Sequence, residues 1–201
     1  MKTPGLNEHG VQPHVQLREP GFGEGLMLAT LFGLAYIASF YLNAHVVNAH
    51  SVFSGVALFY LPAGVKLLAI MVGRYWGALG LWIANFLHTA TSWDNLVLSQ
   101  VFVMSIVWVG TTLLVVMTWA HLTGLRTDLR NLTFRVFVWL NLLAALIHGL
   151  VFNGYLIIVA ERGVEEWLSS AKAMALGDFL GSGVLMLSIL LAYKAMKWLR
   201  R

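Results

Sequence analysis

Residues 59–80 read FYLPAGVKLLAIMVGRYWGALG and contain the main irregularity of an otherwise apolar chain. A proline, Pro62, lies inside the apolar run, and Lys66 follows it by four residues. Proline has no amide hydrogen and clashes with the preceding helical turn, so a helix that runs through it kinks or breaks. Proline is well tolerated at the first position of a helix. We therefore expect a helix that is broken or kinked at Pro62.

A break at this point would start a short helix from Pro62 to Gly73 near the middle of a membrane. The free N–H groups at such a helix start attract anions and carbonyl oxygens. Pro62, Gly64 and Lys66 are then candidate ligand contacts. The alternative is a kinked helix in which the Lys66 side chain extends along the surface to the cytoplasmic interface. The sequence leaves both readings open.

The composition indicates a membrane protein. The chain has 201 residues, of which 59% are hydrophobic and 11% are charged, with a mean hydropathy of +0.75. Soluble domains average about 25% charged residues. The chain contains no cysteine, which excludes disulfides, thiolate metal sites and cysteine nucleophiles.

The hydropathy pattern predicts an all-α, polytopic fold with about six transmembrane helices. About 20 apolar residues are needed to cross the hydrocarbon. The predicted spans are about 26–43, 52–73, 76–92, 97–120, 136–160 and 173–193. The alternative is five spans plus a re-entrant segment. In domain terms, residues 1–24 form a polar tail and residues 25–201 form the bundle.

The basic residues predict the orientation of the bundle. With six spans, both termini lie on the same side. That side would hold eleven of the thirteen basic residues: Lys2, Arg18, Lys66, Arg74, Arg126, Arg130, Arg135, Lys194, Lys197, Arg200 and Arg201. Basic residues accumulate in cytoplasmic segments, so we expect both termini to be cytoplasmic. The net charge of +4 then indicates contact with membrane lipid rather than with nucleic acid.

Polar residues within the predicted spans are candidate site residues, because ionisable groups are costly inside a membrane. His88, His148 and Asp178 belong to different spans but lie at similar depth. The polar residues that accompany them are Asn85, Asn141 and Asn153, and Ser182 shares a helix face with Asp178. One interpretation is that these groups hydrogen-bond one another and fix the helix register. The other is a polar cavity that binds a small polar molecule or ion.

The sequence shows no motif typical of an enzyme, a metal site or a resident cofactor. No serine has a histidine at helical spacing, and no phosphate-binding glycine loop is present. His88 and His148 could ligate a haem, because two histidines at one depth can hold the iron. This alternative is less favoured, since pairs of histidines at similar depth arise easily by chance. We expect a non-enzymatic protein.

Two groups of residues resemble a known family. The first group contains LPAG at 61–64, GRYW at 73–76, Gly80 and Asn85-Phe86, and the second is GDFLG at 177–181. In these two regions the chain resembles the bacterial membrane-associated sensor (MASE-type) domains. Lys66 occupies a position that is normally apolar in that family. The family normally continues into a cytoplasmic signalling domain, whereas this chain ends at Arg201. The resemblance implies a sensor in the bacterial inner membrane, whose output would come from a signalling partner.

Three functions remain open at this stage. The first is a sensor-like or small-ligand-binding module that acts through a partner protein. The second is a substrate-binding component of an energy-coupling-factor-like transporter, which would meet its transport partner through small residues such as Ala29-x-x-x-Gly33. The third is a structural accessory subunit of a membrane complex, in which the polar residues only lock the helices together.

Overall fold

The structure is a computed structural model that describes residues 20–47, 59–92, 96–125, 129, 131–160 and 164–199. The polar tail at 1–19 and the first part of the predicted span 52–73 lie outside these residues. The described part of the chain is helical. Its elements are α1 (Phe22–Leu42), a π-helical turn η1 (Asn43–Val47), α2 (Leu61–Ser92), α3 (Leu98–Thr123), α4 (Phe134–Ala160) and α5 (Val164–Leu199).

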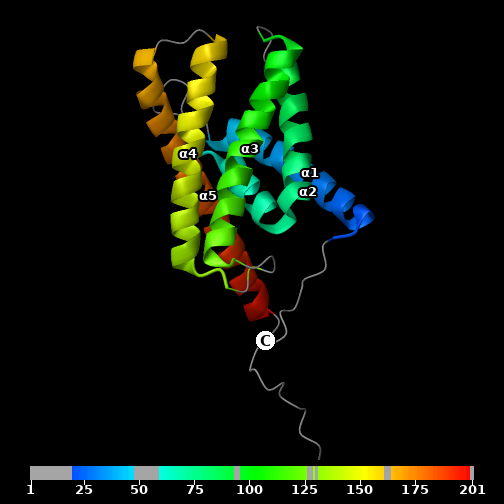
Figure 1. The fold of residues 1–201 in the computed structure, drawn as a ribbon. Helices are drawn as coiled ribbons and strands as arrows, with labels where there is room; N and C mark the ends of the chain where they lie inside the picture. The colour runs from blue at the N-terminus through cyan, green and yellow to red at the C-terminus, as the bar shows by residue number, and fades with distance from the viewer. Residues whose placement is uncertain are drawn as a thin grey trace, which may run out of the picture.

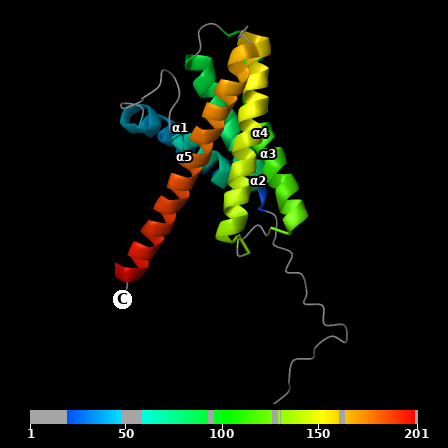
Figure 2. The ribbon, with the colours of Figure 1, turned by 90° about the vertical axis from the view of Figure 1, so that its left-hand side faces the viewer.

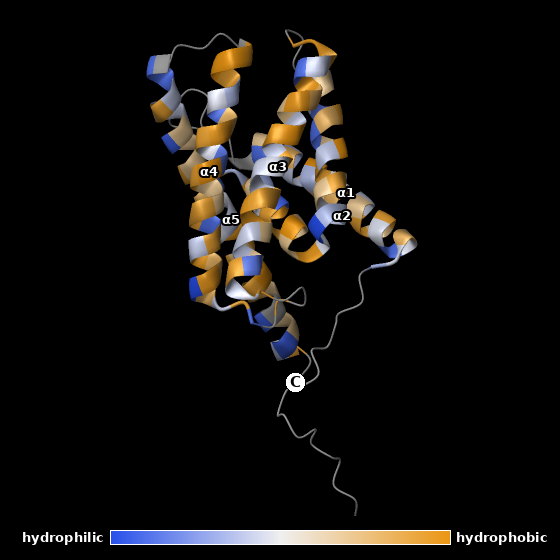
Figure 3. Cartoon of the chain, in the orientation of Figure 1, coloured by the Kyte–Doolittle hydropathy of each residue, from blue (hydrophilic) through white to orange (hydrophobic). Residues whose placement is uncertain are grey.

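The expectation of an all-α membrane protein with several spans is confirmed at this level. Five helices in the described ranges are long and apolar enough to cross a membrane. Figure 3 shows hydrophobic residues along most of the length of each of them. Four predicted spans correspond to α1, α3, α4 and α5. Helix α5 begins nine residues before the predicted 173–193, because residues 164–172 continue it without a break.

The other two predicted spans, 52–73 and 76–92, appear as two arms of α2 that meet at Arg74. The backbone of Arg74 is not helical, with φ 47° and ψ −124°, and the helix bends there. The first arm covers 61–73, about 20 Å at the helical rise, which is shorter than the roughly 30 Å hydrocarbon core. Among the described residues, α2 starts at Leu61 with Pro62 as its second residue. The expected break at Pro62 stays a prediction, since residues 48–58 lie outside the description.

The helices form an up-and-down bundle with one crossing element. The second arm of α2, α3, α4 and α5 run in alternating directions, and Figure 1 places the end of α3, the start of α4 and the end of α5 at one end of the molecule. Helix α1 crosses these helices at a steep angle (Figures 1 and 2). Toward its C-terminal end α5 leans away from α4, as Figure 2 shows.

Small residues allow α1 to lie close to the second arm of α2. A Cβ atom on Gly33 would be 3.0 Å from the carbonyl oxygen of Gly80, and one on Gly80 would meet the carbonyl of Ala29. Such spacing of small residues lets two backbones approach closely in a membrane, where packing rather than hydrophobicity holds helices together. Ala29 and Gly33 are both buried in this contact. The transporter hypothesis assigned the surface at Ala29 and Gly33 to a partner protein. In the structure this surface packs against α2 of the same chain.

Candidate functional site

Three ionisable side chains meet in the centre of the bundle. Lys66 comes from the first arm of α2, His148 from α4 and Asp178 from α5. His148 Nδ1 lies 2.7 Å from Asp178 Oδ2, and Lys66 Nζ lies 3.7 Å from the same oxygen. All three residues are almost completely buried, with exposures of 2%, 1% and 4% for Lys66, His148 and Asp178. We call these three residues the ion cluster.

Aromatic rings enclose the ion cluster. Lys66 Nζ lies 4.3 Å from the ring centroid of Trp108 in α3, a cation–π distance. The same indole meets the His148 ring edge-on, with ring centroids 6.1 Å apart. The Phe152 ring stacks on the same imidazole, with centroids 5.5 Å apart. The ion cluster is therefore shielded by apolar rings, which strengthens its internal electrostatic interactions.

The ion cluster lies near the middle of the bundle's height. His148 is roughly 18 Å from the end of α4 at Ala160 and roughly 21 Å from its start at Phe134, at 1.5 Å per residue. Asp178 is about 21 Å from the start of α5, which lies at the same end of the molecule as the end of α4 (Figure 1). In a bilayer with a hydrocarbon core of about 30 Å, this depth is close to the midplane.

A small cavity adjoins Lys66. It has a volume of about 10 Å³, and its polar lining consists of Lys66, Thr112, Asn141, Asp178 and Ser182. Within the described part of the chain, Lys66 Nζ and Thr112 Oγ1 are buried without a hydrogen-bond partner. The cavity is just large enough for one water molecule. A larger ligand would have to part the helices.

A second polar group lies beside the ion cluster and is satisfied internally. The Tyr36 hydroxyl donates to Asn85 Oδ1 at 2.9 Å, and the Asn85 amide donates to Ser105 Oγ at 3.1 Å. Tyr36 also packs against Trp108, with ring centroids 5.1 Å apart. Asn85, a predicted ligand contact, thus holds α1, α2 and α3 together.

The start of α2 is capped by protein groups. The Leu61 N–H donates to Asn43 Oδ1 at 3.0 Å, and the Tyr60 N–H donates to the Gly177 carbonyl at 3.1 Å. Pro62 has no N–H to offer. The expectation that free N–H groups at this helix start bind a ligand is therefore wrong for Leu61 and Tyr60, because Asn43 and α5 supply their acceptors.

Pro62 and Gly64 lie in the contact between α2 and α5, and their role as ligand contacts stays a prediction. Pro62 is fully buried at the start of the helix. A Cβ atom on Gly64 would lie 2.9 Å from the Cβ of Leu185 and 3.0 Å from the Cα of Ser182. A Cβ on Gly181 would fall on the backbone of Tyr60. The face of α5 that carries Gly177 and Gly181 is thus the surface on which the start of α2 rests.

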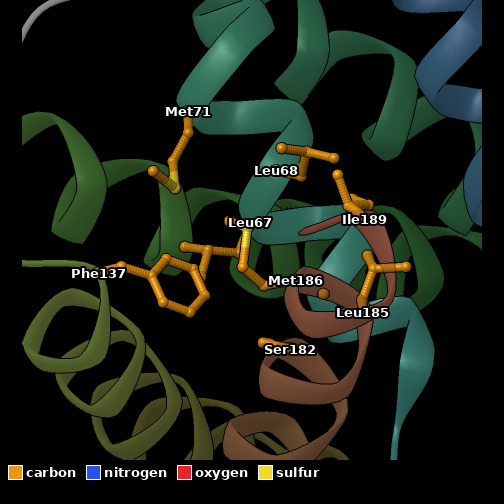
Figure 4. Close-up of a pocket in the computed structure, with 9 residues that line it drawn as sticks. Leu67, Leu68, Met71, Phe137, Ser182, Leu185, Met186 and Ile189 are labelled. Atoms are coloured by element: carbon orange, nitrogen blue, oxygen red, sulfur yellow. The ribbon is translucent and has the colours of Figure 1, made fainter. Parts of the chain in front are cut away.

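An apolar groove continues from this contact. It is lined by Gly64, Leu67, Leu68, Met71, Phe137, Ser182, Leu185, Met186 and Ile189 (Figure 4). Figure 4 shows that these side chains come from the first arm of α2, the start of α4 and the second half of α5. Leu67 and Ser182 also line the polar cavity, so the groove and the cavity are neighbours.

His88 does not join the ion cluster. It is half-buried, and its ring packs against Phe40 of α1 with centroids 3.9 Å apart. Nδ1 of His148 is hydrogen-bonded to Asp178. The structure therefore does not bring the two histidines of the haem alternative together. Among the described residues, no group of three His, Asp or Glu side chains is arranged to hold a metal ion.

The remaining predicted residues lie together. Lys66, Asn141, His148, Asp178 and Ser182 all contribute to the ion cluster or its cavity. Asn141 donates to the Phe179 carbonyl at 3.0 Å, and Ser182 donates to the Asp178 carbonyl at 2.7 Å. The side chain of Lys66 points inward, so the reading in which it extends to the interface is wrong.

The contributors that were missed include Trp108, Thr112, Phe152 and Tyr36. A signal existed for Trp108, because tryptophan normally gathers near the ends of spans and this one lies in the middle of the predicted span 97–120. Thr112 follows it by four residues and so lies on the same helix face. Tyr36 has no comparable signal. No protein-family model, curated protein or solved structure matches the chain.

Proposed function

We propose that the chain is a sensor-like, small-ligand-binding membrane module whose site is the ion cluster and which acts through a partner protein. The observation that carries this proposal is the convergence of Lys66 and His148 on one oxygen of Asp178, with the three residues on three helices. A change at this point acts on two helix contacts at once, that of α2 with α5 and that of α4 with α5.

Charged groups inside the bundle are costly to bury. A buried ion pair is often no more stable than well-packed apolar residues of similar volume, so stability alone does not explain its presence. Ionisable residues in membrane spans are functional candidates for this reason. Here the charges hold α2 and α4 to α5, and a ligand or a proton that alters one charge changes the relative strength of those contacts.

The second half of α5 is the segment that a partner protein would contact. From Leu187 to Leu199 every residue whose side chain is described is exposed, including Leu187, Leu190 and Leu191. This half leans away from α4 and continues to the basic C-terminal end with Lys194 and Lys197 (Figure 2). A small rotation of α5 at Asp178 would be carried along the helix to this end, where a partner protein would detect it.

The proposal includes the predicted topology and location. Both termini are cytoplasmic, the two arms of α2 count as separate passes, and the membrane is the bacterial inner membrane. The resemblance of LPAG, GRYW and GDFLG to membrane-associated sensor domains supports this assignment, and no enzymatic activity is part of it. A structural role is the second candidate, favoured by the internally satisfied Tyr36–Asn85–Ser105 group. The transport alternative loses its proposed partner surface at Ala29 and Gly33.

A distance measurement separates sensing from a purely structural role. The chain has no cysteine, so introduced cysteines can carry spin labels without background. One label pair at Trp139 and Leu191 reports the separation of α4 from the second half of α5. A control pair at Leu146 and Leu176 reports on the first half of α5. All four positions are exposed.

Asp178→Asn is the test variant, and Lys172→Met, which removes an exposed charge from the same helix, is the control. We expect Asp178→Asn to shift the distance distribution of the Trp139–Leu191 pair and to leave the Leu146–Leu176 pair unchanged. Identical distributions for the first pair in wild type and Asp178→Asn would contradict the sensor proposal and favour the structural role.

A further inference from the structure

The composition of the ion cluster is unbalanced: one acid faces two bases. Lys66 Nζ and His148 Nδ1 both approach Oδ2 of Asp178, at 3.7 and 2.7 Å. A carboxylate oxygen only accepts hydrogen bonds, so Nδ1 carries a hydrogen and any additional proton on His148 must be on Nε2. Nε2 is buried without a hydrogen-bond partner in the described part of the chain.

The membrane interior limits the net charge that such a site can carry. Isolated charges in a medium of low dielectric constant are strongly disfavoured, whereas a paired acid and base are tolerated. One carboxylate can neutralise one cation. Lys66 and His148 therefore cannot both be charged without leaving a net positive charge at the centre of the bundle.

We infer that the ion cluster is a proton-binding site in which Lys66 and His148 compete for a single proton. This inference rests on the proposed function and names its ligand. With the proton on Lys66, the ammonium pairs with Asp178 and ties α5 to α2. With the proton on His148, the imidazolium pairs with Asp178 and ties α5 to α4. Between the two settings Nζ loses one proton, Nε2 gains one, and Asp178 remains a carboxylate, so the net charge stays zero.

The surroundings of Asp178 are consistent with this account. The other titratable groups that interact electrostatically with it are the phenols of Tyr36 in α1 and Tyr60 before α2. Helix α3 contributes Trp108, whose ring accepts the ammonium in the first setting. The cavity beside Lys66 and Thr112 has room for one water molecule, which would solvate Nζ. In the geometry described above both bases contact Oδ2 of Asp178 at once, His148 at 2.7 Å and Lys66 at 3.7 Å, so both settings can form with only small movements of the side chains.

The protonation state of His148 tests the inference directly. Nitrogen NMR of the full chain with ¹⁵N-labelled histidine distinguishes an imidazole, which has one unprotonated nitrogen, from an imidazolium, which has none. His148→Gln identifies the His148 signals among those of the seven histidines. The measurement is made on wild type, Lys66→Met and the control Lys172→Met at one neutral pH.

We expect a neutral His148 in wild type and in Lys172→Met. In Lys66→Met we expect the loss of the unprotonated-nitrogen signal, because His148 becomes the cation that Asp178 pairs with. His148 in the same protonation state in wild type and Lys66→Met overturns the inference. If Lys66→Met does not fold, Lys66→Gln, which keeps a polar end in the cavity, gives the same comparison.

The outcome is independent of the spin-label experiment. A His148 that stays neutral removes the competition for the proton but leaves any movement of α5 in Asp178→Asn unaffected. An α5 that does not move removes the sensor proposal but leaves the protonation of His148 in Lys66→Met unaffected. The two failures are therefore distinguishable.

Discussion

A single oxygen atom, Oδ2 of Asp178, organises the candidate site. It contacts both Lys66, which lies 112 positions earlier in the chain, and His148, which lies 30 positions earlier (178 − 66 and 178 − 148). Removal of either partner of a buried pair leaves an uncompensated charge, which costs about 3–5 kcal/mol. Removal of both partners leaves no uncompensated buried charge.

This leads to a residue-scale prediction. Asp178→Asn leaves the Lys66 charge unpaired, and we expect it to lower the free energy of unfolding by about 3 kcal/mol or more. The double variant Lys66→Met/Asp178→Asn should be more stable than Asp178→Asn alone, because no buried cation remains beside the amide. Thermal unfolding in detergent measures both, with Lys172→Met as the exposed control. A double variant less stable than Asp178→Asn would contradict the ion pair.

The sequence identified most members of the site but not their contacts. Lys66, His148 and Asp178 were conspicuous because charged residues are rare inside apolar spans. Their depth along each helix follows from counting residues, but which way each side chain faces depends on how the helices rotate about their axes. Rotation is set by packing between distant segments, for example Gly181 against Tyr60. For that reason His88 was grouped with the cluster although it packs against Phe40, and the direction of Lys66 was left open.

At the scale of elements, the bend of α2 depends on one unusual backbone conformation. Arg74 has φ 47°, in the left-handed region that residues with a Cβ atom rarely adopt. Strain of this kind costs on the order of 1–3 kcal/mol. The sequence predicted two separate spans around this position from hydropathy alone. The positive φ at Arg74 was not predictable, because arginine has no preference for it and the neighbouring Gly73 was the more suitable residue.

Arg74→Gly should relieve this strain. We expect Arg74→Gly to be more stable than Arg74→Ala by about 1 kcal/mol, because glycine adopts positive φ without a steric penalty. Both variants remove the same charge, so their difference isolates the backbone. Chemical or thermal unfolding of the purified variants gives the comparison. An alanine variant as stable as the glycine variant would argue against the bend at this residue.

The contact between α5 and the start of α2 gives a second prediction for an element. Gly181→Ala places a methyl group on the Tyr60 backbone, whereas Gly110→Ala in α3 meets no atom within 4 Å. We expect Gly181→Ala to lower the melting temperature. Gly110→Ala should keep or raise it, since alanine favours a helix over glycine by roughly 1 kcal/mol. The same change in melting temperature for both would show that α5 does not rest on Tyr60.

At the scale of the whole molecule, the charges are distributed unevenly between the two ends of the bundle. Arg135 at the start of α4 and Lys194 and Lys197 near the end of α5 belong to one end (Figure 1). The other end carries Glu165 and Glu166 at the start of α5. Six separate spans were expected, whereas the described residues hold five spanning helices, because the two predicted spans on either side of Arg74 form one bent helix. The all-helical, multi-span class could be predicted from hydropathy. The steep crossing of α1 could not, because it depends on Gly33, Gly80 and Ala29 meeting across the interface.

This asymmetry predicts the sidedness of the protein. A reporter fused after Arg201 should lie in the cytoplasm, and a reporter inserted in the connection 161–163 between α4 and α5 should lie on the opposite side. Paired reporters, one active only in the cytoplasm and one active only outside it, measure both positions. Two reporters on the same side would mean that α5 does not cross the membrane.

The mid-depth position of the ion cluster has an electrical consequence. Moving one elementary charge across a whole membrane changes its free energy by about 2.3 kcal/mol for each 100 mV of voltage. His148 lies about midway along α4, with Phe134 and Ala160 at its ends, so a proton arriving from either surface crosses about half of that voltage. The difference of about 1 kcal/mol per 100 mV corresponds to a roughly fivefold change in occupancy. A proton that enters or leaves the ion cluster, as distinct from one that passes between Lys66 and His148, would thus respond to the membrane voltage as strongly as to a modest change in pH.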